Sequence, residues 1–257
     1  MSLETLKIKL FCDGADLKDI EKMAANPMIK GFTTNPTLMR KAGIADYAGF
    51  AREALAIVGD KPISFEVFSD DFAEMEREAR VIASWGGNTY VKIPVSNTTG
   101  NSAAALVRKL SAEGIALNVT AVFTLEQVRE IADALNPTAP SIVSVFAGRI
   151  ADTGMDPMPL MSQSVGILAG LPHSELLWAS PRELLNVFHA EATGCHIITA
   201  TPDILAKLSL VGKDLRDYSL ETVKMFYNDA KAAGYRLDGD AAAGAKIINV
   251  AAARSSA

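Results

Sequence analysis

Short apolar runs recur along this chain, and each is followed by a segment with helical periodicity. Their starting positions advance by roughly 20 to 35 residues, which is the length of one strand, one helix and two loops. There are eight such runs, at 7–14, 30–35, 63–68, 89–94, 116–121, 141–148, 175–180 and 195–201. Eight βα units in one chain predict a parallel (β/α)8 TIM barrel of the α/β class.

Helix start and stop signals lie between the runs. Side chains that cap helix N-termini precede three predicted helices: Asp16 before LKDIEKMAA, Asp70 and Asp71 before FAEMEREARVIASW, and Thr124 before LEQVREIADAL. A further helix is predicted over 181–192, where apolar residues recur at helical spacing. Gly86, Gly87 and Gly114 are expected to end helices, because glycine accepts the left-handed conformation of a helix C-terminus.

The alternative architecture is a doubly wound open sheet, which normally has a glycine-rich phosphate turn after its first strand. The string FCDGA, at 11–15, is no such turn. Beyond the eighth run, helices are predicted over 203–210 and 219–233. We therefore expect a single barrel domain with an additional C-terminal helix over 1–235, followed by an alanine-rich tail over 236–257 whose end frays.

Composition and charge exclude several classes of protein. Of the 257 residues, 49% are hydrophobic and 21% are charged, a balance typical of a globular chain with a sizeable core. No apolar stretch reaches the ~18 residues that a membrane span needs, and residues 1–11 lack the apolar region of a secretory signal. We expect a cytoplasmic protein without a membrane partner. The net charge of -5 also disfavours nucleic-acid binding.

Cysteines and histidines give no sign of a metal site. Cys12 and Cys195 are too few for a disulfide framework and do not have metal-ligand spacing. His173, His189 and His196 are widely separated, and we interpret them as structural. No metal and no cofactor are expected.

Polar residues interrupt the apolar runs, mostly near their C-terminal ends. Both faces of a barrel strand are buried, so a polar side chain there needs a partner or a chemical role. TIM-barrel enzymes place their active sites at this end of the strands. The candidates for one shared site are Asp13, Asn35, Glu66, Lys92, Asn118, Thr120, Ser144, Arg149, Ser180 and Arg182.

Lys92, in the string TYVKIP, is the most informative of these residues. A neutral lysine amine is a nucleophile for carbonyl groups. Asp13 and Glu66 supply the carboxylates with which a Schiff-base enzyme moves protons. The structural alternative is a lysine that pairs with Glu66 or extends to the rim of the barrel.

Arg149 and Arg182 follow the sixth and seventh runs, where TIM barrels commonly bind phosphate. Ser180, Pro181 and Arg182 are predicted to open a helix whose free amides add to this anion site. As isolated surface residues, the two arginines would instead be solvated ion-pair partners.

These motifs together resemble the transaldolase family, which includes the smaller fructose 6-phosphate aldolases. The resemblance covers roughly residues 7–210, and GFTTNPTL, at 31–38, is its most specific string. GGNTYVKIP, at 86–94, resembles the Schiff-base strand of the family, and SVFAGRIAD, at 144–152, resembles its phosphate-binding strand. LWASPRE, at 177–183, and GCHIITATP, at 194–202, complete the pattern.

The resemblance implies a role for each candidate residue. Lys92 would form the Schiff base, Asp13 would be the acid/base residue, and Glu66 with Thr120 would hold the catalytic water. Asn35 and Asn118 would bind hydroxyls of the donor sugar, and Ser144 would line the pocket. The phosphate would be held by Arg149, Ser180 and Arg182.

Two positions bear on the subfamily. Glu66 and Phe146 resemble the transferase members, whereas aldolase members typically have Gln and Tyr there. We therefore expect a transaldolase that moves a dihydroxyacetone unit from fructose 6-phosphate or sedoheptulose 7-phosphate to an aldose phosphate. The alternatives are aldolase-type cleavage and transfer from a modified ketose. A non-catalytic barrel would have lost Lys92 or Asp13, and both are present.

The predicted helix over 219–233 has an apolar stripe with few charges. Such a stripe either packs across a neighbouring chain or covers the barrel of its own chain. We expect a homo-oligomer whose ligands are sugar phosphates.

Overall fold

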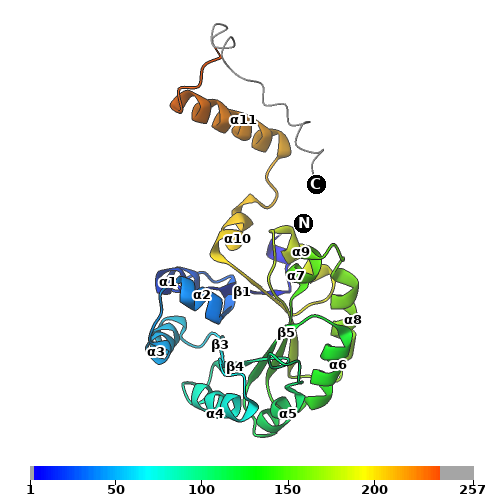
Figure 1. Cartoon of the computed structure of the whole chain (residues 1–257). Helices are drawn as coiled ribbons and strands as arrows, with labels where there is room; N and C mark the ends of the chain where they lie inside the picture. The colour runs from blue at the N-terminus through cyan, green and yellow to red at the C-terminus, as the bar shows by residue number, and fades with distance from the viewer. Residues whose placement is uncertain (1–2, 238–257) are drawn as a thin grey trace, which may run out of the picture. The chain divides into compact units, whose positions relative to one another are not determined.

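Eight parallel strands close into a barrel in the computed structural model, which describes residues 3–237 (Figure 1). Each strand pairs with the next along the chain, and β8 pairs with β1. The strands are β1 Lys9–Asp13, β2 Ile29–Thr33, β3 Ile63–Glu66, β4 Thr89–Pro94, β5 Leu117–Val122, β6 Ser141–Val145, β7 Ser174–Trp178 and β8 Ile197–Ala200. The predicted TIM barrel is confirmed.

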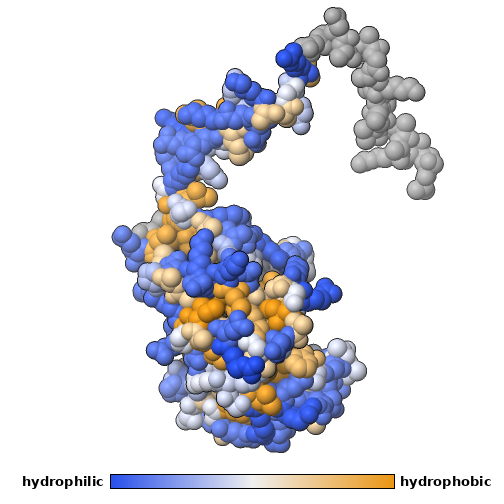
Figure 2. Space-filling model, turned by 90° about the vertical axis from the view of Figure 1, so that its left-hand side faces the viewer, coloured by the Kyte–Doolittle hydropathy of each residue, from blue (hydrophilic) through white to orange (hydrophobic). Residues whose placement is uncertain are grey.

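Helices α1 to α10 alternate with the strands and surround them, and α11 follows in the chain (Figure 1). They are α1 Leu17–Ala24, α2 Pro36–Lys41, α3 Tyr47–Val58, α4 Phe72–Ala83, α5 Ala104–Ala112, α6 Leu125–Ala134, α7 Ala147–Asp152, α8 Met158–Leu168, α9 Leu185–Ala192, α10 Pro202–Ala206 and α11 Leu215–Ala232, with short 3-10 turns at Leu3–Thr5 and Lys207–Leu210. On the face turned to the viewer in Figure 2, apolar side chains gather near the middle of the barrel unit among polar ones.

Three of the four predicted capping residues begin their helices, whereas Asp70 accepts hydrogen bonds from the amide and hydroxyl of Thr98 instead. Asp16 accepts hydrogen bonds from the first-turn amides of α1, and Asp71 does the same for α4. Thr124 and Gln127 form a reciprocal capping box at the start of α6. These contacts satisfy backbone amides that have no partner inside the helix.

One predicted helix end is wrong. Helix α4 ends at Ala83, and its C-cap Ser84 has right-handed backbone angles, so Gly86 and Gly87 do not terminate it. Neither of these two glycines has a positive φ. Gly114 has a φ of 81° directly after the C-cap of α5, as predicted.

The segment between β7 and α9 also differs from the prediction. Ser180, Pro181 and Arg182 do not open a helix, because α9 begins only at Leu185. Ser180 has a φ of 60°, which is incompatible with a right-handed helix. The Asn186 side chain accepts a hydrogen bond of 2.7 Å from the Arg182 amide, so that amide is not free to bind an anion.

The strand in the sixth predicted run, 141–148, is shorter than predicted. Strand β6 ends at Val145, and helix α7 begins at Ala147. Arg149 therefore lies in the first turns of a helix, one residue after Gly148.

Two layers of inward-pointing side chains fill the barrel. The lower layer is an apolar cluster that contains Phe11, Ile142, Leu177 and Ile197. Side chains two residues apart on a strand point the same way, so the next inward layer carries Asp13, Ser144, Ala179 and Thr199. The apolar layer closes the barrel beneath this second layer, which is polar in β1, β6 and β8.

The chain divides into two compact units, Met1–Val211 and Gly212–Ala257. Helix α11 starts one turn before the predicted residue 219, because the Asp214 side chain caps its first amides. No residue of α11 is buried. Most of the predicted tail, 238–257, lies outside the described residues.

No helix within residues 3–237 is long and apolar enough to cross a membrane.

Candidate active site

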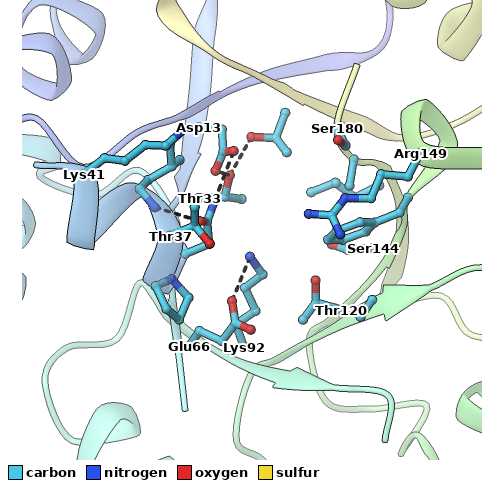
Figure 3. A pocket seen from close by; sticks show the side chains of 18 of the residues that line it. Asp13, Thr33, Thr37, Lys41, Glu66, Lys92, Thr120, Ser144, Arg149 and Ser180 are labelled. Carbon is cyan, nitrogen blue, oxygen red and sulfur yellow. Dashed lines mark hydrogen bonds and ion pairs between the residues drawn. The ribbon is translucent and has the colours of Figure 1, made fainter. Parts of the chain in front are cut away.

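A cavity of about 500 Å³ opens at the C-terminal ends of the strands (Figure 3). Its walls combine apolar side chains with both acidic and basic ones. Every predicted site residue except Asn118 lines it, namely Asp13, Asn35, Glu66, Lys92, Thr120, Ser144, Phe146, Arg149, Ser180 and Arg182.

Lys92 projects from β4 into this cavity and is only 6% exposed. Its Nζ lies 3.2 Å from Oε2 of Glu66 on the neighbouring strand β3. The same Nζ donates a hydrogen bond of 3.0 Å to the Thr34 carbonyl oxygen. The lysine amine is therefore directed by two partners and still borders a space that admits a small molecule (Figure 3).

Asp13 ends strand β1 on the same cavity. Its Oδ1 accepts a hydrogen bond of 2.7 Å from the Thr33 hydroxyl, and its Oδ2 lies 3.5 Å from Nδ2 of Asn35. Burial raises the pKa of this carboxyl above its usual range, and the nearby Lys92 charge offsets only part of that rise. A carboxyl with a raised pKa is suited to take up and return a proton.

Thr120 presents a buried hydroxyl that has no hydrogen-bond partner among the described residues. The neighbouring Ala121 has a φ of 59°, and the pairing of β5 with β6 shifts register between Val119 and Val122. This irregularity lies in the stretch of β5 that carries Thr120. An unpartnered hydroxyl beside Lys92 is suited to bind a water or a substrate hydroxyl.

Asn118 lies beneath the cavity and is fully buried. Its Nδ2 donates a hydrogen bond of 2.9 Å to the Ser64 hydroxyl, and its Oδ1 accepts one of 2.7 Å from the Ser144 hydroxyl. Ser144 itself lines the cavity. Asn118 therefore does not line the cavity itself but forms a hydrogen bond with Ser144, which does.

Two arginines, Arg149 and Arg182, line the cavity, and Arg149 faces Asp13 across it (Figure 3). The Arg149 guanidinium stacks over the Phe146 ring, with 5.0 Å from its central carbon to the ring centroid. The Arg182 Nε lies 3.1 Å from Oδ1 of Asp152, so that guanidinium already has an anionic partner. Arg149 forms no ion pair with an acidic side chain within residues 3–237 and is the better placed of the two to meet an anion.

Four further polar residues line the cavity that the sequence did not indicate: Thr33, Thr37, Lys41 and Thr199. Lys41, from α2, faces Arg149 across the cavity in Figure 3. Thr33 and Thr199 were recognisable as polar residues inside apolar strands, which is the same signal that selected Ser144. Lys41 follows no strand directly, so only the tertiary structure brings it here.

The cysteines and histidines lie outside this arrangement. Burial raises the pKa of both thiols, Cys12 and Cys195, to about 12, so neither is a thiolate at neutral pH. The Nδ1 of His196 accepts a hydrogen bond from the Leu176 amide. Within residues 3–237, no group of three His, Cys, Asp or Glu side chains has the geometry of a metal site.

Solved structures with a similar fold have little sequence in common with this chain. A protein of the dihydrodipicolinate synthase family from Coccidioides immitis aligns with a TM-score of 0.58 at 14% identity, covering 90% of this chain and 80% of that one. A 2,3-dimethylmalate lyase aligns with a TM-score of 0.52, also at 14% identity, covering 92% and 87%. At this identity the likeness concerns the barrel fold alone.

Other proteins share much more sequence identity with this chain. A probable transaldolase from Thermoanaerobacter sp. (strain X514) is 36% identical over 231 residues, covering 90% of this chain and all of that protein. A probable transaldolase from Hyphomonas neptunium is 36% identical over 228 residues, covering 88% and 99%. The profile of the Transaldolase/Fructose-6-phosphate aldolase family matches residues 10–246. This chain therefore belongs to the transaldolase/fructose-6-phosphate aldolase family.

Proposed function

We propose that the protein is a transaldolase that carries a dihydroxyacetone unit on Lys92. One observation carries the proposal: the Lys92 amine is buried between strands and borders a cavity of about 500 Å³ that Glu66 and Asp13 also line. A cavity of this size accommodates a sugar phosphate. The donor would be fructose 6-phosphate or sedoheptulose 7-phosphate, and the acceptor an aldose phosphate.

The first half of the reaction cleaves the C3–C4 bond of the donor ketose phosphate. The neutral Lys92 amine attacks the C2 ketone to form a carbinolamine. Uptake of one proton from solvent then expels the carbinolamine hydroxyl as water and leaves a protonated imine. Asp13 accepts the proton of the C4 hydroxyl while the C3–C4 bond breaks and its electron pair moves into the imine, forming an enamine. The aldose phosphate leaves, and three carbons stay bound to Lys92.

The second half reverses these steps on a different aldehyde. The enamine carbon attacks the aldehyde of the acceptor, and Asp13 returns its proton to the new hydroxyl. Water then hydrolyses the imine and releases the ketose. Glu66 and the unpartnered Thr120 hydroxyl would hold that water beside Lys92, and both line the same cavity as Lys92.

Recognition of the sugar phosphate falls to the remaining polar residues. The phosphate would bind on the Arg149 side of the cavity, with Ser180 and Arg182 as additional contacts. Asn35 and Ser144 would contact donor hydroxyls, and Asn118 would act by orienting the Ser144 hydroxyl. We further propose that the enzyme is cytoplasmic, is a homo-oligomer and uses sugar phosphates without a cofactor.

Borohydride trapping tests the covalent step. Incubation with fructose 6-phosphate and borohydride should add a reduced dihydroxyacetone unit to Lys92, detected by peptide mass spectrometry. The Lys92→Ala variant should show neither adduct nor turnover. Lys9→Ala is the matched control, because Lys9 lies on β1 outside this cavity and pairs with Glu175 at the surface. A wild-type protein without an adduct on Lys92 would exclude the proposed mechanism.

Substitution of Asp13 tests the proton transfer. Asp13→Asn should still form the imine slowly but cleave the C3–C4 bond about 100-fold to 10,000-fold more slowly. Rapid-quench measurement of the released aldose phosphate separates these two steps. An unchanged cleavage rate would assign the proton transfer to Glu66 instead.

The second candidate function is aldolase-type release of free dihydroxyacetone, including release from a modified ketose. Glu66 and Phe146 favour transfer, because an apolar ring next to the enamine leaves no phenol to protonate it. Replacing Glu66 by Gln and Phe146 by Tyr in one chain should raise release relative to transfer about tenfold, or about 1.4 kcal/mol of differential barrier. Quantifying both products with and without erythrose 4-phosphate measures the ratio. If the ratio changes only in Arg182→Ala, phosphate binding decides the partition.

A further inference from the structure

Two threonine hydroxyls link the strands on either side of β1 to the carboxylate of Asp13. Thr33, on β2, donates a hydrogen bond of 2.7 Å to Oδ1 of Asp13. The same hydroxyl lies 2.6 Å from the Thr199 hydroxyl on β8. Thr33 is 2% exposed and Thr199 is 5% exposed, so water does not readily replace either contact. Figure 3 shows Thr33 directly beside Asp13.

Counting protons fixes the direction of this chain of hydrogen bonds. An ionised carboxylate only accepts hydrogen bonds, so the single hydroxyl proton of Thr33 is committed to Asp13. Thr33 then has only lone pairs left for Thr199. The Thr199 proton must therefore point at Thr33, and the two hydroxyls donate in series toward Asp13.

The series also distinguishes the two oxygens of Asp13. Oδ1 receives the strong hydrogen bond from Thr33, whereas Nδ2 of Asn35 lies 3.5 Å from Oδ2, at the limit of a hydrogen bond. Asn35 is held in that position because its Oδ1 caps α2 through the Leu38 amide. Oδ2 is therefore the oxygen that remains available to a substrate hydroxyl.

We propose that Thr199 is a positioning residue for proton transfer, whose hydroxyl orients that of Thr33 so that Oδ2 of Asp13 exchanges the proton with the substrate. This inference rests on the proposed transaldolase function. Thr199 also lines the cavity, and it belongs to β8, the one strand for which the sequence indicated no site residue.

The physical effect is a stabilisation of the ionised carboxylate. Hydrogen bonds in series polarise one another, so the bond from Thr33 to Asp13 is stronger when Thr33 itself accepts from Thr199. Loss of that donor should make Asp13 harder to ionise. The charged groups that face Asp13 around the same cavity stay unchanged, namely Lys41, Glu66, Lys92, Arg149 and Arg182.

The pH profile of kcat/KM tests the proposal. Thr199→Val keeps the shape of the side chain but removes its hydroxyl. It should move the acidic limb of the kcat/KM profile to higher pH by about half a unit, which lowers kcat/KM about threefold at pH values below the limb. Thr199→Ser, which keeps the hydroxyl, should restore the wild-type profile.

The matched control is Thr89→Val. Thr89 is a buried threonine on β4 whose hydroxyl has no partner among the described residues, and it does not line the cavity. Its replacement should leave the pH profile unmoved. A purely structural role for Thr199 predicts the opposite pattern, because Val would preserve the packing and the profile while Ser would lose the methyl contacts.

A second measurement does not depend on turnover. The pH dependence of unfolding should differ between Thr199→Val and wild type, and this difference should vanish when both chains carry Asp13→Asn. A difference that persists without the carboxylate would overturn the proposal. Failure of the proposed function is recognised separately, since the wild-type protein would then form no borohydride-trapped adduct on Lys92.

Discussion

At the scale of single residues, the barrel encloses the carboxyl group of Asp13 in surroundings that disfavour its charge. Asp13 and Lys92 are both withdrawn from solvent at the C-terminal ends of their strands. The pKa of Asp13 is raised by burial, against the opposing effect of the Lys92 charge and of hydrogen bonds from Thr33 and Asn35. This carboxyl therefore costs stability when it is ionised.

The sign of that cost predicts the behaviour of Asp13→Asn. Below the pKa of about 3.9 of an unfolded aspartate, both states are protonated and the carboxyl costs nothing. As pH rises through the raised folded-state pKa, the unfolded state is favoured and the wild-type protein loses stability. Asp13→Asn should avoid this loss, gaining about 1.4 kcal/mol for each unit by which the pKa is raised.

Urea unfolding at pH 5 and pH 8 measures this gain, since other titrating groups cancel between the two proteins. The stability difference should be larger at pH 8. A variant that becomes less stable relative to wild type as pH rises would mean that the attraction of Lys92 outweighs desolvation.

At the scale of elements, the Arg149 side of the cavity depends on a close approach between the start of α7 and the segment after β7. The Gly148 amide donates a hydrogen bond of 3.2 Å to the Ala179 carbonyl. A Cβ on Gly148 would lie 1.5 Å from the Ser180 carbonyl oxygen, so only glycine fits there. This contact sets Ser180 beside Arg149, which follows Gly148 in the chain.

We predict that Gly148→Ala pushes these two segments apart. The overpacking should cost about 1–3 kcal/mol of stability. The KM for sugar phosphates should rise more than kcat falls, because Arg149 and Ser180 would be displaced while Lys92 is not. Gly166→Ala is the control: Gly166 lies within α8 with open space around it, and alanine there should stabilise the protein by about 0.5–1 kcal/mol. Equal effects of both variants would contradict this account.

At the scale of the whole molecule, α11 carries apolar side chains that are exposed in the described part of the chain. Leu220, Val223, Phe226 and Tyr227 are between 51% and 66% exposed. They recur at helical spacing and make one apolar stripe along α11. An exposed stripe of this size is typical of an interface, which supports the expected homo-oligomer.

We predict that Phe226→Glu shifts the protein toward smaller species in solution, because a carboxylate on the stripe opposes its burial. Light scattering of the full chain measures the mass. Asn228→Glu is the control, since Asn228 is an exposed polar residue of the same helix and should leave the mass unchanged. A wild-type protein that is monomeric at every concentration would contradict the oligomer.

The fold and most of the site were predictable because both depend on periodicity along the chain. Each βα unit begins with a run of apolar residues, and this repeat specifies parallel strands. The C-terminal ends of these strands meet at one end of the barrel, whatever the conformation of the loops. Lys92, Asp13 and Glu66 were recognisable because a charged residue inside a buried strand requires a partner. The capping residues Asp16, Asp71 and Thr124 bond to amides two or three residues away, so the helix starts that they mark were also predictable from the sequence.

Only the tertiary structure decided which polar groups meet, because those contacts join residues far apart in sequence. The partnership of Thr199 with Thr33 spans 166 positions, and the Arg182–Asp152 ion pair and the approach of Gly148 to Ser180 also join separate βα units. Gly86 and Gly87 showed the same limit, since helix α4 ended before them although glycine permits a left-handed end. The sequence by itself determined the barrel and the polar residues that its strands carry to one end. Three-dimensional packing determined which of these side chains form hydrogen bonds and which charges are paired, because those contacts join distant parts of the chain.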